Sequence, residues 1–119
     1  MTTIYLIRHA EAEGNLYRRI HGHYDALVTT NGYSQIAALE QRFAGVHIDA
    51  VYASDKFRTI TTAGAISKPR GLEVHTDPDL REIFMGEWED TTWGYQGYFA
   101  EKELKQFIIR YMFLCDIPH

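Results

Sequence analysis

The stretch Ile4-Tyr5-Leu6-Ile7-Arg8-His9-Ala10-Glu11 decides the fold of this chain. Four consecutive apolar residues followed by polar groups predict a buried strand over residues 3–7 whose last residues emerge at its carboxyl end. Ligands bind at that edge of open α/β sheets. Arg8 offers a positively charged fork there, and His9 offers a ring nitrogen that can attack or carry a proton. On these residues alone an alternative stays open, in which Arg8 and His9 only cap a strand.

The bulk composition indicates one folded domain over residues 1–119. The chain has 119 residues, of which 45% are hydrophobic and 24% charged, enough for one core. The formal net charge of -4 argues against nucleic-acid binding, because that function favours a basic surface. An anionic substrate would have to be held by local arginines rather than by the overall field.

Cysteine usage and hydropathy favour a cytoplasmic location. Cys115 is the only cysteine, which excludes an intrachain disulfide and fits a reducing compartment. The N-terminus lacks the segments of a signal peptide, and no run approaches the ~20 apolar residues of a membrane span. We therefore expect a chain without a membrane partner.

A long polar connection over residues 11–30 separates the first strand from a predicted helix, and such connections are often functional. Thr29 or Thr30 can cap that helix, with Ile36, Leu39 and Phe43 on one face. A second strand over residues 49–53 follows. The order strand, helix, strand implies a right-handed parallel crossover.

Ser54 predicts the N-cap of a second helix over residues 55–67, with Ile60, Ala63 and Ile66 facing inward. Arg58 then lies near its first turn, where free N–H groups already favour anions, and this strengthens the case for a phosphate site. The alternative is an ordinary surface arginine.

A third strand over residues 72–75 leads to Glu82, which lies close in sequence to Leu80 and Ile83 and could act as an acid or base. A loop glutamate paired with a nearby arginine is the alternative. The aromatic residues Trp93, Tyr95, Tyr98 and Phe99 could wall a ligand site or pack over a core edge. Residues 100–116 predict a helix that is apolar on most sides and must be buried.

An ordered set of motifs resembles the histidine phosphatase superfamily, also called the phosphoglycerate mutase-like family, over roughly the first 90 residues. The set consists of Arg8-His9-Ala10-Glu11, Asn15, Arg19, Gly22, Asp25, Thr29 to Gln35 with Gly32, Ala53-Ser54, Arg58, Thr62-Ala63, Leu80-Arg81-Glu82-Ile83, Gly86, Trp88 and Thr91. The resemblance implies a three-layer α/β/α fold with a mainly parallel sheet.

The resemblance also implies a mechanism without a cofactor or metal. His9 would be the nucleophile and form a phosphohistidine. Arg8 and Arg58 would hold the transferring phosphoryl oxygens, and Asn15 would add a neutral donor. Glu82 would protonate the leaving oxygen and then activate water or an acceptor hydroxyl. His21, which replaces a frequent glutamine, and Gly22 would line the mouth that admits a small phosphorylated substrate.

The chain departs from the family pattern at its far end. The family fold returns a further strand beside the first one, ending in a second catalytic histidine. This sequence lacks that motif, because His75 is misplaced and His119 is terminal. We therefore expect a truncated domain that lacks part of the C-terminal half. An uncovered first strand and a broad apolar helix would favour a homodimer.

Three functions remain open from the sequence. The first is phosphoryl transfer as a phosphatase or, with weaker support, a phosphoglycerate mutase. The second is a non-catalytic phosphate-binding or interaction module, since the second histidine is absent. The third is a metal site built on His21 and His23 with Asp25 or His9, because alternate residues of an extended segment share a side.

Overall fold

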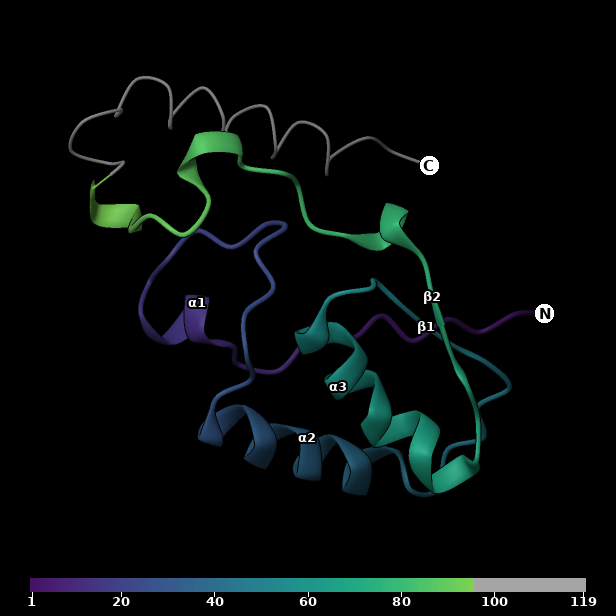
Figure 1. The fold of residues 1–119 in the computed structure, drawn as a ribbon. Coiled ribbons are helices and arrows are strands. Elements are labelled where there is room, and N and C mark those ends of the chain that lie inside the picture. The colour runs from purple at the N-terminus through teal and green to yellow at the C-terminus, as the bar shows by residue number, and fades with distance from the viewer. Residues whose placement is uncertain (96–119) are drawn as a thin grey trace.

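The computed structural model describes residues 1–95, in which helices pack against one small parallel sheet (Figure 1). The longer elements are α1 (Glu13–Leu16), α2 (Thr30–Phe43), β1 (Val51–Ala53), α3 (Phe57–Ser67) and β2 (Val74–Thr76). Three 3-10 turns complete the set: η1 (Lys68–Arg70), η2 (Pro78–Leu80) and η3 (Gly86–Trp88). The expected helix over residues 100–116 lies outside the described residues, as do Tyr98 and Phe99.

The sheet consists of β1 and β2, which pair in parallel with Val51 opposite Val74 and Ala53 opposite Thr76. Helix α3 connects the two strands and packs against both (Figure 1). Parallel neighbours need such a crossover because a tight turn cannot join them. The predicted strands near residues 49–53 and 72–75 are therefore confirmed, each in shorter form.

Helix α2 begins where the sequence predicts it to begin. The Thr29 hydroxyl oxygen accepts a hydrogen bond from the Gly32 backbone N–H at 3.0 Å, which satisfies one of the free donors of the first turn. The same hydroxyl donates to the Glu11 carboxylate at 2.7 Å. Thr29 therefore caps α2 and ties its start to the segment that follows His9.

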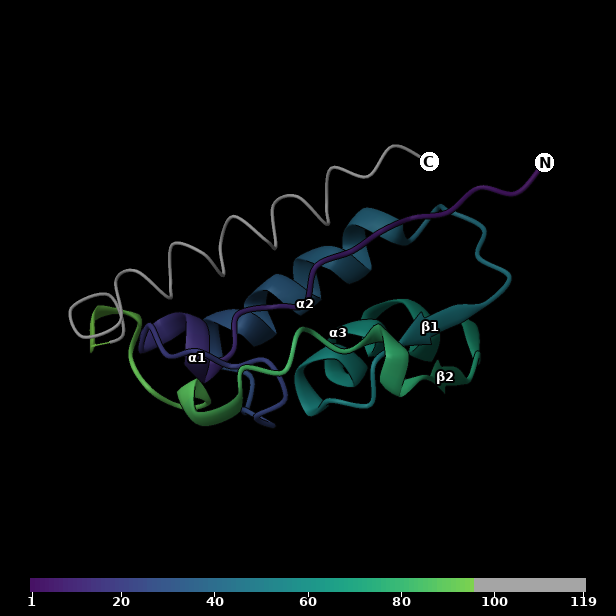
Figure 2. The same cartoon turned by 90° about the horizontal axis from the view of Figure 1, so that it is seen from above.

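Phe43, Val51 and Ile66 form the buried cluster that joins α2, β1 and α3. Leu39 packs against it, as the predicted apolar face of α2 requires. Ile60, expected to face inward, is 38% exposed, so that expectation is wrong. Figure 2 shows α2 and α3 as neighbouring helices, and the two are in contact. Among residues 1–95, no helix is both long and apolar enough to cross a bilayer.

The predicted first strand does not form within the described part of the chain. No strand is assigned over residues 3–7, and Ile4 and Leu6 are 83% and 98% exposed. A strand requires a neighbour for its backbone N–H and C=O groups, and the described sheet contains only β1 and β2. Tyr5 packs edge-to-face on Phe43 with ring centroids 5.3 Å apart. The prediction of a buried strand is wrong here.

Ser54 does not cap α3 either. The N-cap is Lys56 and the helix begins at Phe57. The Ser54 hydroxyl instead shares a 2.7 Å hydrogen bond with the Thr59 hydroxyl, which removes it from capping. Asp25 supplies a replacement from a distant loop, because its carboxylate accepts from the Phe57 N–H at 2.8 Å.

We expect Thr29→Ala to lower the free energy of unfolding by about 1–2 kcal/mol, because the first turn of α2 loses its cap. Urea unfolding followed by circular dichroism measures the change. Thr29→Ser retains the hydroxyl and is the matched control, for which most of the loss should be absent. An unchanged midpoint in Thr29→Ala would contradict the capping role.

Candidate active site

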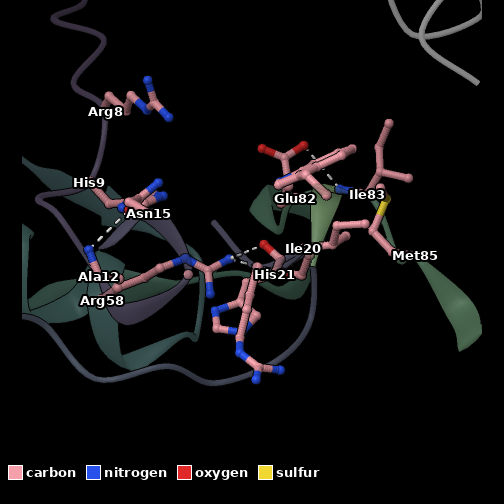
Figure 3. Close-up of a pocket in the computed structure, with 14 residues that line it drawn as sticks. Arg8, His9, Ala12, Asn15, Ile20, His21, Arg58, Glu82, Ile83 and Met85 are labelled. Carbon is pink, nitrogen blue, oxygen red and sulfur yellow. Dashed lines mark hydrogen bonds between the residues drawn. The ribbon is translucent and has the colours of Figure 1, made fainter. Parts of the chain in front are cut away.

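One pocket of about 290 Å³ brings together side chains from five separate segments (Figure 3). All seven residues predicted from the sequence line it: Arg8, His9, Asn15, His21, Gly22, Arg58 and Glu82. Arg8 and His9 precede α1, Asn15 lies on α1, and Arg58 lies in the first turn of α3. In Figure 3, Arg8, His9, Asn15 and Arg58 lie on one side of the pocket, and Glu82, Ile83 and Met85 lie on the other.

The backbone beside His9 fixes which ring nitrogen is free. Nδ1 of His9 lies 2.7 Å from the Ala10 carbonyl oxygen. A carbonyl oxygen only accepts, so Nδ1 must carry the proton, and Nε2 of the neutral ring keeps its lone pair. The Ala10 N–H donates to the Thr62 hydroxyl of α3 at 2.9 Å. This bond attaches the His9 segment to the helix that carries Arg58.

The surroundings of His9 favour the neutral ring. Partial burial lowers the pKa of His9 most, the bond to Ala10 opposes it, and the positive charges of Arg58 and Arg8 lower it further. The Glu82 carboxylate raises it slightly, and the pKa stays below the ordinary value of 6.5. Near neutral pH His9 is therefore unprotonated at Nε2, the state that a nucleophile requires.

Arg58 is the most buried charge of the pocket, with 3% exposure. Its guanidinium donates to the carbonyl oxygens of Gly22 and Tyr24, both at 2.8 Å, and more weakly to that of His21 at 3.3 Å. Burial lowers the pKa of Arg58, but a guanidinium stays charged in proteins. Arg58 therefore holds the loop over residues 21–24 and also presents a positive charge to the pocket.

Glu89 holds the same loop through its backbone N–H groups, whereas Arg58 binds its carbonyl groups. Its carboxylate accepts backbone N–H groups of His23 at 2.8 Å, Tyr24 at 3.0 Å and Gly22 at 3.2 Å. The Met85 N–H adds a fourth bond at 3.1 Å. Burial raises the pKa of Glu89, but these four donors together outweigh it, so the pKa lies below the ordinary range.

Glu89 is a residue of the site that was not predicted from the sequence. The available signal was its place directly after Trp88, in the last of the motifs that resemble the family. A carboxylate that accepts several backbone amides cannot be recognised before the distant loop is placed. The same holds for Thr62, whose bond to Ala10 joins residues 52 positions apart.

Asn15 is oriented by its own helix. Its amide oxygen accepts the Ala12 N–H at 3.0 Å (Figure 3), and the amide NH₂ group has no hydrogen-bond partner among residues 1–95. Arg8 is exposed, and its guanidinium has no hydrogen bond or ion pair within residues 1–95. Both residues can therefore donate to an anion without first giving up a partner.

The His21 side chain forms a hydrogen bond with Asp90 and does not lie in a cluster of metal ligands among the described residues. Its Nε2 lies 2.9 Å from the Asp90 carboxylate, and the bond from His21 holds the pKa of Asp90 below its usual range. The His23 ring lies against Phe84 instead, with centroids 5.1 Å apart. Within the part of the chain that the structure describes, no group of three or more His, Cys, Asp or Glu residues could hold a metal ion. The predicted metal site on His21, His23 and Asp25 or His9 is therefore wrong for these residues.

Comparison with known proteins agrees with this geometry. The family model described as the histidine phosphatase superfamily (branch 1) matches residues 4–107. A Serratia proteamaculans protein described as a probable phosphoglycerate mutase, GpmB, is 43% identical over 90 residues. The match covers 76% of this chain and 42% of that protein.

Solved structures show the same fold. Bacillus stearothermophilus YhfR matches with a TM-score of 0.78 and 30% identity, over 84% of this chain and 50% of that chain. A phosphoserine phosphatase from Entamoeba histolytica, in complex with 3-phosphoglyceric acid, matches with a TM-score of 0.67 and 34% identity. That match covers 75% of this chain and 44% of the phosphatase. The predicted α/β fold class is confirmed, and the chain spans half or less of these relatives.

We expect Gly22→Ala to displace the loop over residues 21–24, since a Cβ there would lie 1.8 Å from the Ile83 carbonyl oxygen. Overpacking of this kind lowers the free energy of unfolding by roughly 1–3 kcal/mol, and affinity for inorganic phosphate should fall with it. Urea unfolding and calorimetric titration measure the two effects. Gly45→Ala is the control, because nothing lies within 4 Å of a Cβ at Gly45. Equal behaviour of both variants would refute the close packing.

The His9 ring should titrate below the ordinary value of 6.5. NMR titration of the ring signals, assigned by comparison with His9→Gln, gives the midpoint. Because unfolding restores the ordinary pKa, the unfolded chain binds more protons in the window below 6.5, and stability falls as the pH drops through it. A midpoint above 6.5 would contradict the described surroundings of His9.

Proposed function

The chain belongs to the histidine phosphatase superfamily, and on that basis we propose that it transfers the phosphoryl group of a small phosphomonoester through a phosphohistidine at His9. The family is enzymatic, and its members named above include a phosphoserine phosphatase and a probable phosphoglycerate mutase. The observation that carries the proposal is the bond from His9 Nδ1 to the Ala10 carbonyl at 2.7 Å. It leaves Nε2 with its lone pair in a pocket that Arg8 and Arg58 also line.

In the proposed first step, Nε2 of His9 attacks the phosphorus atom and forms the N–P bond while the ester O–P bond breaks. Glu82 gives its proton to the departing oxygen, so that an alcohol leaves rather than an alkoxide. Arg8, Arg58 and the Asn15 amide stabilise the charge on the transferring oxygens. In the second step Glu82 accepts a proton from water, which attacks the phosphorus and releases inorganic phosphate and neutral His9.

The pocket favours a phosphatase over a mutase. Beyond its cationic side it is lined by apolar side chains, namely Ile20, Ile83, Met85 and Trp93. Arg19 also lines the pocket, but it forms an ion pair with Asp90 at 3.4 Å. An apolar wall suits an uncharged leaving group better than the second anionic group of a phosphoglycerate.

A second candidate is a non-catalytic phosphate-binding module. Asn15 and Arg58 are held by contacts that do not involve a nucleophile, and Arg8 lines the same pocket. Such a pocket would bind a phosphate ester without turning it over.

We also propose a homodimer and a cytoplasmic location. The exposed apolar side chains of Ile4 and Leu6 offer surface that a second copy would bury. The single cysteine fits a reducing compartment. The proposed partner of the pocket itself is a small phosphorylated substrate, without a metal.

Incubation with a reactive phosphodonor, such as acetyl phosphate, should add one phosphoryl group to the wild-type chain. Intact-mass spectrometry measures the adduct, which should be labile to acid and absent from His9→Ala. His47→Ala is the matched control, because the His47 side chain is 85% exposed and should leave labelling unchanged. A folded wild-type chain that binds phosphate but gains no adduct would leave the binding module as the function.

A further inference from the structure

Arg81 and Asp55 form a two-point ion pair between segments that are 26 residues apart. Nε of Arg81 donates to one carboxylate oxygen of Asp55 at 2.6 Å, and an NH₂ group of Arg81 donates to the other. The side chains are 29% and 32% exposed, so the pair is partly shielded from water. A guanidinium fork on a carboxylate fixes direction as well as distance, which a single bond does not.

The pair connects the two elements that bear opposite sides of the pocket. Asp55 lies between the end of β1 and the first turn of α3, three residues before Arg58. Arg81 directly precedes Glu82. Neither Asp55 nor Arg81 lines the pocket, so neither would touch a substrate bound there.

Glu82 has few contacts that hold it in place. It is exposed, and its carboxylate accepts a hydrogen bond from the adjacent Ile83 N–H at 3.1 Å. The position of its carboxylate therefore depends on the backbone around residue 81. That backbone is anchored by the Arg81 N–H, which donates to the Pro78 carbonyl of η2 at 3.1 Å, and by the Arg81 side chain on Asp55.

We propose that the Asp55–Arg81 pair is a positioning device that holds Glu82 where it can protonate the leaving oxygen. The inference rests on the proposed phosphoryl transfer, because only a reaction with a departing oxygen uses an acid there. Hydrogen bonds from Arg81 lower the pKa of Asp55, so the carboxylate stays charged across the neutral range in which the enzyme would work. Asp55 and Arg81 are thus positioning residues, and Glu82 is the acid.

A positioning role predicts a dependence on the leaving group that a general loss of folding does not. An alkyl phosphate releases a strongly basic alkoxide unless an acid protonates it, whereas 2,4-dinitrophenyl phosphate releases a stable anion. A general acid contributes about 10²–10⁴-fold to a reaction that needs it. Displacing Glu82 should therefore slow hydrolysis of the alkyl ester far more than hydrolysis of the dinitrophenyl ester.

The experiment compares kcat/KM for phenethyl phosphate and for 2,4-dinitrophenyl phosphate in the wild-type chain and four variants. This parameter reports the first phosphoryl transfer alone, in which Glu82 acts as the acid, and not the second step, in which it acts as a base. Asp55→Asn and Arg81→Lys should each lower the ratio of alkyl to dinitrophenyl turnover by about 10-fold, as expected when a catalytic group shifts by part of an ångström. Glu82→Gln sets the upper limit of this effect. Asp49→Asn is the matched control, since it removes an exposed carboxylate that, within residues 1–95, bonds to His47 on the protein surface.

The outcomes distinguish a positioning role of the ion pair from a purely structural role and from failure of the proposed function. A selective loss for the alkyl ester in Asp55→Asn and Arg81→Lys, in the direction of Glu82→Gln, supports the positioning role. An equal loss for both esters would show a structural role and overturn the inference, as would a ratio identical to that of Asp49→Asn. If the wild-type chain hydrolyses neither ester, the proposed function itself is wrong and the inference fails with it.

Discussion

The buried guanidinium of Arg58 is the interaction on which the site depends. A charge with 3% exposure is costly unless polar partners surround it. Here three carbonyl groups of the loop over residues 21–24 supply them at 2.8–3.3 Å. The loop is therefore held by hydrogen bonds that the buried guanidinium needs in place of water. The same guanidinium lines the pocket, so the positive charge proposed to bind phosphate and the shape of the pocket opening depend on one side chain.

A carboxylate complements the Arg58 guanidinium on the same loop. Glu89 accepts the N–H groups of the loop whose carbonyl groups Arg58 binds. Thr62 attaches the His9 segment to α3, and Arg81 attaches the Glu82 segment to the start of α3 through Asp55. Helix α3 and the residues directly before it are thus linked to the His9 segment, to Arg58 and to the Glu82 segment, the proposed nucleophile, anion-binding charge and acid. Within residues 1–95, these polar links connect the segments that line the pocket.

Sequence reasoning predicted the parts of the fold that depend on local chemistry. Thr29 caps α2 by accepting a hydrogen bond from a residue three positions away. The motifs around His9, Arg58 and Glu82 can be recognised from short stretches of sequence, and all three residues line the pocket. It failed where distant backbone decides the outcome. Residues 3–7 have strand composition, but a strand needs a neighbouring ladder. Ser54 has a side chain that could cap a helix, but its hydroxyl forms a hydrogen bond with the Thr59 hydroxyl instead. The role of Glu89 could not be predicted, because it depends on four backbone N–H groups, three of which belong to a loop distant in sequence.

The most direct test of this account is an NMR titration with inorganic phosphate that follows the Arg58 Nε–H signal and the backbone amides of Gly22 and Tyr24. The account predicts that Arg58 and the Asn15 side-chain amide shift together with one dissociation constant. The two loop amides should remain protected from exchange, because Glu89 keeps them bonded. If phosphate leaves the Arg58 signal unchanged, Arg58 does not bind phosphate. If the loop amides exchange freely, Glu89 does not hold the loop that Arg58 contacts. Either result would contradict the proposed link between the loop and the phosphate site.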